Sequence, residues 1–268
     1  MVHRLRRFAA DHWVLAIALI VLLYLFVPIG VVAAMSFREA RNNAPYTLDN
    51  FKFTLDNWKH PFGVPGIQEA FLLSVTIALV ATVGATILGT LMSFALARHS
   101  FRGRGATNTL IFLPMATPEI VMGSSLLALF VASGVPLGFW TVVIAHIMFC
   151  LSFVVVTVKA RLAGLDPRLR EAAMDLYADE RQTFMRVTLP LVMPGIVAAA
   201  LLSFSLSFDD FIVTNFNSGT SVTFPMFVWG ASQRGIPAQI NVIGTAMFLV
   251  SFLIVLIGQL PRLRRRAR

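Results

Sequence analysis

Six long apolar stretches dominate this 268-residue sequence and limit what it can fold into. Each is long enough to cross a bilayer as a helix, because a hydrocarbon core of ~30 Å requires about 20 apolar residues. Only 13% of the residues are charged, whereas soluble domains carry about 25%. We therefore predict an all-α integral membrane protein with six transmembrane helices. The predicted spans are Trp13–Met35, Ala70–Ala97, Thr107–Ser133, Phe139–Val158, Val187–Val213 and Ile240–Leu260.

The six predicted spans and their connections use the whole chain, so we expect a single transmembrane domain over residues 1–268. The first apolar run follows the basic sequence RLRR, as the core of a signal peptide would. Such a core is only about 7–15 residues long, so we expect this longer run to be retained as the first span. The single cysteine, Cys150, lies within the fourth predicted span and excludes both a disulfide framework and a cysteine metal cluster.

The basic residues are concentrated on one side of this predicted topology. Seventeen of the 22 lysines and arginines lie before span one, after span six, between spans two and three, or between spans four and five. Because basic loops stay in the cytoplasm, we expect both termini to be cytoplasmic. The basic tail Arg262–Arg268 would then meet anionic membrane lipid. This topology accounts for the net charge of +9, and we expect no nucleic-acid partner.

Two features of the spans predict how the helices bend and pack. Span three contains Pro114 and Pro118, and proline removes a backbone donor and clashes with the preceding turn, so we expect a kink there. Span two contains Gly84 and Gly89, and small residues of this kind allow helices to approach closely.

Three acidic residues lie within the predicted spans, where an acid costs about 2.5–3.5 kcal/mol and is by default a functional candidate. They are Glu119 in span three and the adjacent pair Asp209 and Asp210 near the outer end of span five. Neighbouring helical residues point about 100° apart, so at most one aspartate need face a pathway. One interpretation is a site for a cation, assisted by the aromatic rings of Phe208 and Trp229.

The alternatives to a cation site are structural. The two aspartates could be solvated at the membrane interface and cap the next helix, and Glu119 could be protonated and hydrogen-bonded. His146 lies in the middle of span four, and we expect it to be a packed, hydrogen-bonded histidine. We expect no metal site and no catalytic residue.

The segment Leu165–Pro190 is too polar to cross the membrane and has the capping signals of two short helices. Asp166 followed by Pro167 is typical of a helix start, as is Asp179 with Gln182 three residues later. We expect a turn near Tyr177–Asp179 and the start of span five at Pro190. A hairpin of this kind fits either a groove on a partner protein or a lipid surface, and the residues alone leave both open.

The same segment resembles the cytoplasmic motif of permease subunits from binding-protein-dependent ABC importers. The motif residues of this chain keep every spacing of that motif: Glu171, Ala172, Ala173, Tyr177, Val187, Leu189 and Pro190. The resemblance extends over nearly the whole chain and is greatest to the spermidine/putrescine permeases, through SVTIALVATVGATILGTLMSFALAR and LSFSLSFDDFIVTNFNSG. Tyr177 departs from the family, which has a turn glycine there, and a tyrosine with positive φ is strained. We therefore expect the turn to form at Ala178–Asp179 instead.

This resemblance implies a bacterial cell-membrane permease that imports a small cationic solute such as spermidine or putrescine. The motif segment would be a coupling helix that docks on an ATP-binding ABC subunit, present as a dimer. The other implied partners are a homologous second permease and an extracytoplasmic solute-binding protein. The chain contains no G-x-x-x-x-G-K-[ST] phosphate loop, so we expect ATP hydrolysis to reside in the partner and no cofactor to be bound here.

Three other functions are considered. An intramembrane serine protease would need a G-x-S-G nucleophile motif, and both Ser-Gly pairs of the chain lack the first glycine. A proton-coupled secondary transporter would be expected to contain internal repeats, and it would leave the charged hairpin unexplained. An ABC importer for a sugar, a phosphonate or a metal ion remains an alternative to the polyamine importer.

Overall fold

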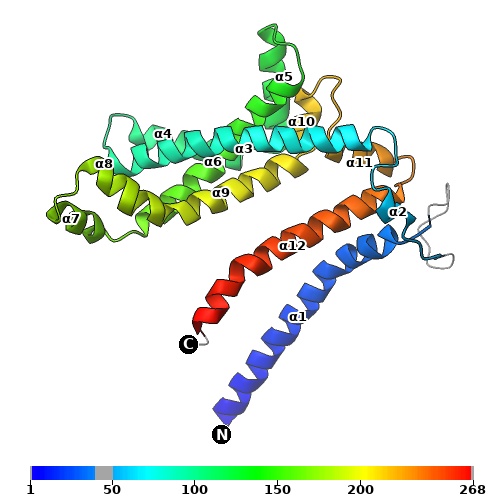
Figure 1. The fold of residues 1–268 in the computed structure, drawn as a ribbon, viewed down its shortest axis with the longest axis horizontal. Coiled ribbons are helices and arrows are strands. Elements are labelled where there is room, and N and C mark those ends of the chain that lie inside the picture. The colour runs from blue at the N-terminus through cyan, green and yellow to red at the C-terminus, as the bar shows by residue number, and fades with distance from the viewer. Residues whose placement is uncertain (1, 40–50, 267–268) are drawn as a thin grey trace. The chain divides into compact units, whose positions relative to one another are not determined.

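The computed structural model describes residues 2–39 and 51–266. In this part of the chain the regular elements are helices, apart from one isolated β-bridge between Arg38 and Phe53. The helices form two compact units (Figure 1). The smaller unit combines Met1–Gln68 with Val228–Arg268, and the larger unit is the continuous segment Glu69–Phe227. The prediction of an all-α protein is confirmed.

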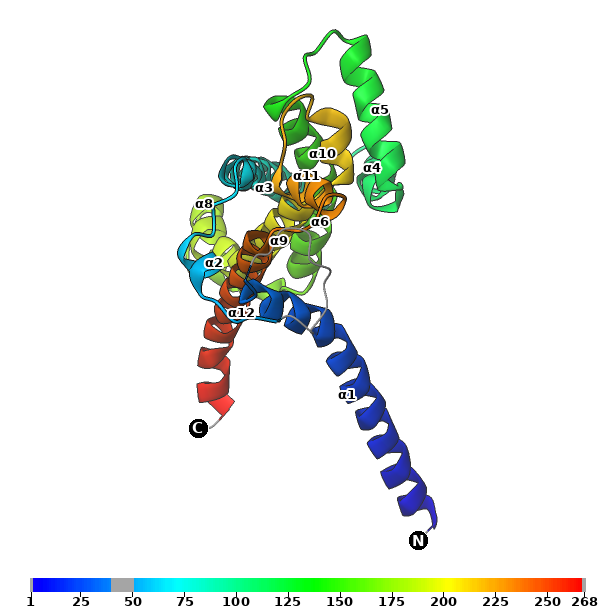
Figure 2. The ribbon, with the colours of Figure 1, turned by 90° about the vertical axis from the view of Figure 1, so that its right-hand side faces the viewer.

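The smaller unit is built on two long helices, α1 (Val2–Ser36) and α12 (Ala238–Arg266). They contact each other through the edge-to-face pair Phe26 and Phe248, whose ring centroids are 6.4 Å apart. The helices diverge towards the two termini of the chain (Figure 2). The short helix α2 (Asp56–Lys59) is tied to the end of α1, because the Asn57 amide donates to the carbonyls of Ser36 and Arg38. The basic tail reaches residues 267 and 268, which lie outside the described residues.

The larger unit contains three long helices, α3, α6 and α9, that lie alongside one another (Figure 1). Helices α7 and α8 lie at one end of this unit, and α5 and α10 lie towards the other. The helices are α3 (Ile67–Arg98), α4 (Arg104–Ala116), α5 (Glu119–Ala132), α6 (Phe139–Ala163), α7 (Arg168–Asp175), α8 (Glu180–Thr183), α9 (Leu189–Asp209), α10 (Ile212–Asn217) and α11 (Phe224–Ser232), which continues into the smaller unit.

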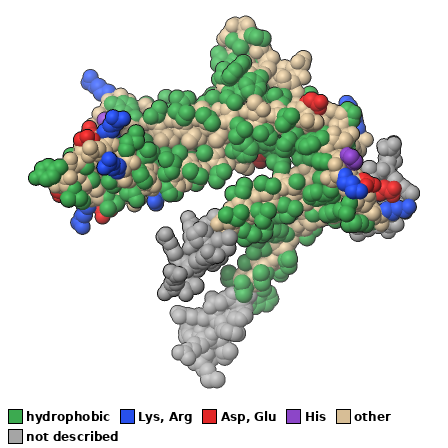
Figure 3. Space-filling model, viewed as in Figure 1, with side chains coloured by type: hydrophobic (Ala, Val, Ile, Leu, Met, Phe, Trp, Pro, Cys, Tyr) green, Lys and Arg blue, Asp and Glu red, His purple; other side chains and the backbone are tan. Residues whose placement is uncertain are grey.

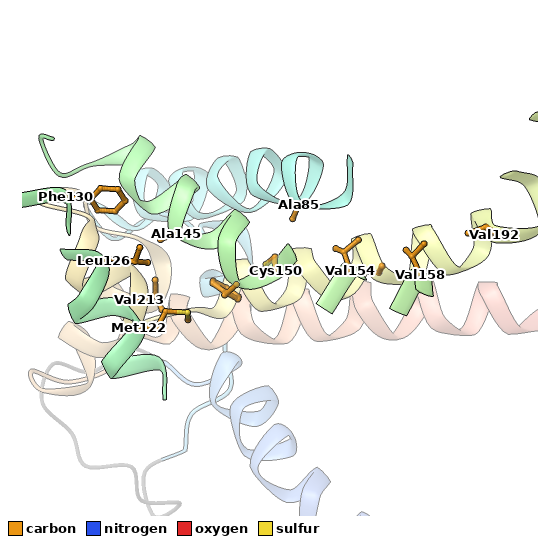
Figure 4. Close-up of a cluster of buried hydrophobic side chains, with 12 residues drawn as sticks. Ala85, Met122, Leu126, Phe130, Ala145, Cys150, Val154, Val158, Val192 and Val213 are labelled. Atoms are coloured by element: carbon orange, nitrogen blue, oxygen red, sulfur yellow. The ribbon is translucent and has the colours of Figure 1, made fainter. Parts of the chain in front are cut away.

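The core of the larger unit follows α6, whose buried side chains meet residues of α3, α5, α9 and α10 (Figure 4). The predicted role of the glycines in α3 is confirmed. A Cβ atom at Gly84 would lie 2.7 Å from Ile147 Cδ1, and one at Gly89 would lie 2.6 Å from Val154 Cγ1. The two helices therefore approach closely at both points, and at Gly89 the neighbouring Val154 Cβ leaves no room for a larger residue. On the face shown in Figure 3, apolar side chains cover most of the unit, and lysines and arginines gather at the α7–α8 end.

The described residues contain four continuous helices long and apolar enough to cross a membrane, or five if one bent pair counts as a span. The four are Trp13–Ser36, Ile67–Arg98, Phe139–Ala163 and Glu180–Asp209. The sixth predicted span corresponds to α12, whose apolar described part, Ala238–Ile254, is shorter.

Span three, predicted as the single helix Thr107–Ser133, is two helices in the structure. Helices α4 and α5 meet at an angle of 108°. The break falls where the prolines predicted a kink: Thr117 is extended with ψ 133°, and Pro118 precedes the first residue of α5. A residue before proline avoids the helical region, and proline has no N–H to continue the hydrogen-bond pattern. The predicted bend is confirmed, but a continuous span is wrong.

Span five also differs from its predicted bounds. Helix α8 runs through a π-helical turn, Phe184–Thr188, directly into α9, and the helix ends at Asp209 rather than at Val213. No break separates the charged hairpin from the span at Pro190. The wider turn places the Leu189 N–H on the Phe184 carbonyl, and such π turns relieve the clash that proline creates inside a helix.

Candidate functional site

A cavity of about 500 Å³ lies in the larger unit, where α4 gives way to α5 and where α9 ends. Both helix interruptions have a local cause. Pro118 separates α4 from α5, and Asp210 is extended with ψ 125°, so α9 cannot continue into α10. The cavity is lined by Pro114, Met115, Thr117, Glu119, Met122, Phe149, Phe153, Leu206, Asp209, Asp210, Phe211, Ile212 and Val213.

The cavity brings together the three acidic residues that the sequence singled out. Glu119 is the first residue of α5, Asp209 is the last residue of α9, and both are exposed. Glu119 is the acidic residue in the first turn of α5, a position that the helix dipole makes favourable for an acidic side chain. None of the described residues that line the cavity is a lysine or an arginine. The cavity therefore has a negative field suited to a cation.

Asp210 differs from Asp209 because its carboxylate is turned into the protein, with 6% of the side chain exposed. Its Oδ2 atom accepts hydrogen bonds from the backbone N–H of Thr214 at 2.7 Å and from the Thr214 hydroxyl at 2.8 Å. Its Oδ1 atom accepts from the Val213 N–H at 3.4 Å. Asp210 therefore caps α10, as the structural alternative had it, but its carboxylate is buried rather than solvated.

His146 on α6 lies against this cap and is 1% exposed. Its Nε2 atom is 3.3 Å from Asp210 Oδ2 and 3.0 Å from Thr214 Oγ1, and its Nδ1 atom is 2.7 Å from Ser207 Oγ. The expectation of a packed, hydrogen-bonded histidine is confirmed. Its contact with Asp210 was not foreseen, because the two residues are distant in sequence and only the fold brings them together.

Three phenylalanines in the lining were missed by sequence reasoning: Phe149 and Phe153 on α6, and Phe211 between α9 and α10. Phe149 and Phe153 are four residues apart, so they share a face of α6, and the ring of Phe149 lies 5.2 Å from that of His146. Phe149 and Phe153 follow His146 by three and seven residues, so the helical period could have placed all three side chains on one face of α6. The π faces of such rings attract cations.

The two aromatic residues predicted from the sequence occupy other places. Phe208 is buried and packs against Phe71 and Phe224, with ring centroids 5.9 and 6.2 Å away. It is absent from the described lining of the cavity. Trp229 lies on α11 in the smaller unit and is 57% exposed.

The segment carrying the sequence motif forms the two short helices α7 and α8, as predicted. Asp166 Oδ1 accepts from the backbone N–H of Arg168 at 2.9 Å, and Asp179 Oδ1 accepts from that of Gln182 at 2.7 Å. The motif residues Glu171, Ala172 and Ala173 lie on α7, Val187 lies in the π turn, and Leu189 and Pro190 begin α9.

A second cavity, of about 490 Å³, opens beside this hairpin. Its lining includes Glu171 and Val187, so two of the motif positions face one cavity. The lining also includes Arg98 from the end of α3 and Arg170 from α7. Arg170 in turn contacts Glu180 of α8 at 3.0 Å, which joins the two arms of the hairpin.

The turn of the hairpin lies in the predicted region Tyr177–Asp179, which confirms that prediction, but its left-handed residue is Tyr177 itself, so the finer expectation of a turn at Ala178–Asp179 is wrong. Tyr177 has φ +63° and is the one residue other than glycine with positive φ in the described part of the chain. Its side chain is 98% exposed. The left-handed conformation is thus retained without the glycine that normally permits it.

Comparison with known proteins places the chain among transport proteins. The family described as the binding-protein-dependent transport system inner membrane component matches residues 85–267. The spermidine/putrescine transport system permease protein PotC of Haemophilus influenzae is 39% identical, over 91% of this chain and 94% of that protein. PotC of Escherichia coli is 36% identical over 88% and 89%, and the putrescine permease PotI of that species is 39% identical over 67% and 66%.

Solved structures of two ABC transporters have the same fold. A bacterial alginate transporter, in complex with a pentasaccharide-bound periplasmic protein, superposes with a TM-score of 0.62 at 15% identity, over 94% of this chain and 95% of the matched chain. An amino acid transporter superposes with a TM-score of 0.57 at 16% identity, over 80% of this chain and all of the matched chain.

Proposed function

This chain belongs to the family of inner membrane components of binding-protein-dependent transport systems, and we propose that it forms the translocation path for a polyamine such as spermidine or putrescine. Membership of this family makes it a non-catalytic, multi-pass permease subunit. The names of its relatives PotC and PotI include those solutes. The observation that carries the proposal is the cavity in which Glu119, Asp209 and Asp210 meet.

The chemistry of the cavity matches a flexible chain that bears several ammonium groups. Glu119 and Asp209 are exposed carboxylates that can pair with separate ammonium groups. Phe149, Phe153 and Phe211 offer apolar and π surface for the methylene segments and the charges. Asp210 contributes negative charge to the lining while its carboxylate caps α10. Phe208 supports α9 from its aromatic cluster.

The charged hairpin is the proposed contact with the ATP-hydrolysing partner. Its motif residues lie on α7, in the π turn and at the start of α9. Helix α8 runs without a break into α9, and the last residue of α9 is Asp209. A movement of the hairpin would therefore be transmitted along this helix to its end at the cavity. We propose an ABC ATPase dimer, a homologous second permease and an extracytoplasmic solute-binding protein as the partners, with lipid around the apolar helices.

The charge distribution supports a topology with both termini and the hairpin in the cytoplasm, because most lysines and arginines lie on that side. Six crossings are then required. Helices α1, α3, α6 and the joined α8–α9 supply four, the bent pair α4–α5 supplies the next, and α12 completes the set. The 108° bend places Glu119 at the broken point of its span, where irregular backbone is tolerated if it lines a cavity.

Other solutes remain possible for this fold, as the alginate and amino acid transporters illustrate. The residues of the cavity argue against an anionic solute such as a phosphonate, because its described lining combines three acids with no lysine or arginine. A metal ion would be expected to have several converging ligands. No group of three histidine, cysteine or acidic side chains that could hold one occurs among the described residues.

The test is uptake of labelled putrescine and spermidine by cells that express the permease together with its own partner subunits. Asp209→Asn and Glu119→Gln should each reduce uptake by up to about fivefold, because each removes one exposed carboxylate that is proposed to pair with an ammonium group and an exposed charge pair is worth about 0.2–1 kcal/mol. Glu69→Gln, which neutralises an exposed acid of α3 outside the cavity, is the matched control and should leave uptake unchanged. Normal uptake by both cavity variants would refute the cation site.

A further inference from the structure

The buried polar network behind the cavity wall has no role in the transport mechanism described so far. It consists of His146, Ser207, Asp210 and Thr214, which come from α6, from α9, from the break after α9 and from α10. Polar groups placed out of water are costly unless they are hydrogen-bonded to one another. Here each of the four side chains has at least one polar partner within the network.

The hydrogen bonds of the network place a proton on one atom of the His146 ring. Thr214 Oγ1 donates its only proton to Asp210 Oδ2 at 2.8 Å, so towards His146 it acts as an acceptor. The Nε2 atom of His146 then carries a proton, which faces Thr214 Oγ1 and Asp210 Oδ2. On the other side of the ring, Nδ1 lies 2.7 Å from the Ser207 hydroxyl, which can either donate to it or accept from it.

We propose that His146 is a positioning residue for the substrate site: it binds the Asp210 cap from α6 and thereby fixes the break after α9, where Asp209 is held at the cavity. The inference rests on the proposed function and deepens it, because it divides the three acids by role. Glu119 and Asp209 meet the cation, whereas Asp210 is engaged within the protein and acts through the geometry of the chain.

The surroundings of α10 explain why a single histidine can control this geometry. Helix α10 has only six residues and cannot hold its place alone. The side-chain amide of Asn217 donates to the Gly123 carbonyl of α5 at 3.3 Å. The backbone carbonyl of Asn217 accepts from the Thr141 hydroxyl of α6 at 2.7 Å. A Cβ atom at Gly123 would lie 2.8 Å from Phe216 Cδ2, so α5 and α10 are also in close steric contact.

These contacts mean that α10 links the helix of Glu119 to the helix of Asp209. The His146 contact reaches the first half of α10, near Asp209, where α5 also packs against Val213, and the Asn217 contacts hold the other end of α10. Loss of the histidine should therefore alter the position of Asp209 relative to Glu119. Because two ammonium groups of one polyamine must match two carboxylates, a changed separation should affect putrescine and spermidine unequally.

The experiment compares the ratio of spermidine to putrescine uptake in cells that express the permease variants with the native partner subunits. Recovery of the complex by co-purification normalises each rate. His146→Leu should change the ratio about tenfold, since displacements near 1 Å cost up to about a hundredfold in other sites. His146→Gln, which keeps a donor towards Asp210, should lie nearer to the native ratio.

Cys150→Ala is the matched control. This residue is buried one turn further along α6 and faces α9, but it contacts the Ser203 carbonyl rather than the network. The native ratio should persist in this variant. Equal loss of both amines in His146→Leu, with the ratio preserved, would indicate a purely structural histidine and overturn the proposal. If His146→Leu does not assemble, Thr214→Val takes its place, because it removes the hydroxyl that joins the ring to Asp210.

A measurement that is independent of transport completes the test. Solid-state 15N NMR of the histidine-labelled complex should show, for the signal lost in His146→Gln, a ring protonated on Nε2. A ring whose only proton is on Nδ1 would overturn the assigned network. Failure of the proposed function has a different outcome: Glu119→Gln and Asp209→Asn would transport polyamines normally, whatever the state of the His146 ring.

Discussion

The backbone N–H of Ala178 donates to the carbonyl of Ala173 over 3.1 Å and closes helix α7 around a left-handed residue. The Tyr177 N–H donates in parallel to the Met174 carbonyl at 2.9 Å. This pair of bonds is the Schellman motif, whose left-handed position is usually a glycine. Tyrosine at φ +63° occupies it here, at a cost of roughly 1–2 kcal/mol that glycine would avoid.

Tyr177→Gly should therefore stabilise the hairpin. The gain is expected to be about 0.5–1 kcal/mol, because part of the relieved strain is offset by the greater freedom of glycine in the unfolded chain. Hydrogen exchange of the α7 amides, measured by mass spectrometry on the purified complex, should slow two- to fivefold, as roughly that energy implies. Tyr177→Ala keeps a Cβ at the same φ and should show no such protection. Equal exchange in the two variants would contradict the strain argument.

Asparagine substitutions should separate the roles of the adjacent aspartates. Asp210→Asn removes an acceptor from a buried cap and should lower the stability of the complex by about 1–3 kcal/mol. Asp209→Asn changes an exposed group, so stability should stay within about 0.5 kcal/mol while polyamine uptake falls. Thermal denaturation of the purified complex measures the first effect, and uptake measures the second. A stable Asp210→Asn complex would show that the cap is dispensable.

Close packing of α3 on α6 predicts a steep penalty at Gly89. A Cβ there would lie 2.6 Å from Val154 Cγ1 and 2.7 Å from Val154 Cβ, and the Cβ atom cannot move without the backbone. Gly89→Ala should destabilise the complex by about 1–3 kcal/mol, as over-packed cores do. Gly105→Ala in α4 is the matched control, because nothing lies within 4 Å of its Cβ position. That variant should be neutral or more stable by up to about 1 kcal/mol.

Charge reversal at Glu171 tests the proposed docking of the hairpin. Glu171→Lys should prevent assembly with the ATPase or separate ATP hydrolysis from uptake, because it inverts the charge of a position that lines the cavity beside α7. The readout is the amount of ATPase that co-purifies and the number of polyamine molecules imported per ATP hydrolysed. Glu171→Gln, which keeps the shape of the side chain, should be much milder. Full assembly and coupling in Glu171→Lys would refute the docking role.

The helices and their ends were predictable where local sequence is decisive. Asp166 and Asp179 cap the hairpin helices as their positions indicate, since capping depends on neighbouring backbone groups alone. The bend at Pro118 follows from the missing N–H in the same local way. The position of the hairpin turn was predicted, but the left-handed conformation of Tyr177 was not, because a preference against positive φ, worth about one or two kcal/mol, can be outweighed by the rest of the hairpin.

The sequence by itself determined that this is a helical membrane protein and where its charged hairpin lies. It also identified Glu119, Asp209 and Asp210 as the acidic residues within the predicted spans. These conclusions were possible because the length of an apolar stretch, a helix cap and an acid within a span are all properties of short segments. Only the tertiary structure decided that these acids line one cavity and that Asp210 caps α10 beside His146. Contacts between α6, α9 and α10 depend on packing between distant segments, which no local pattern of residues records.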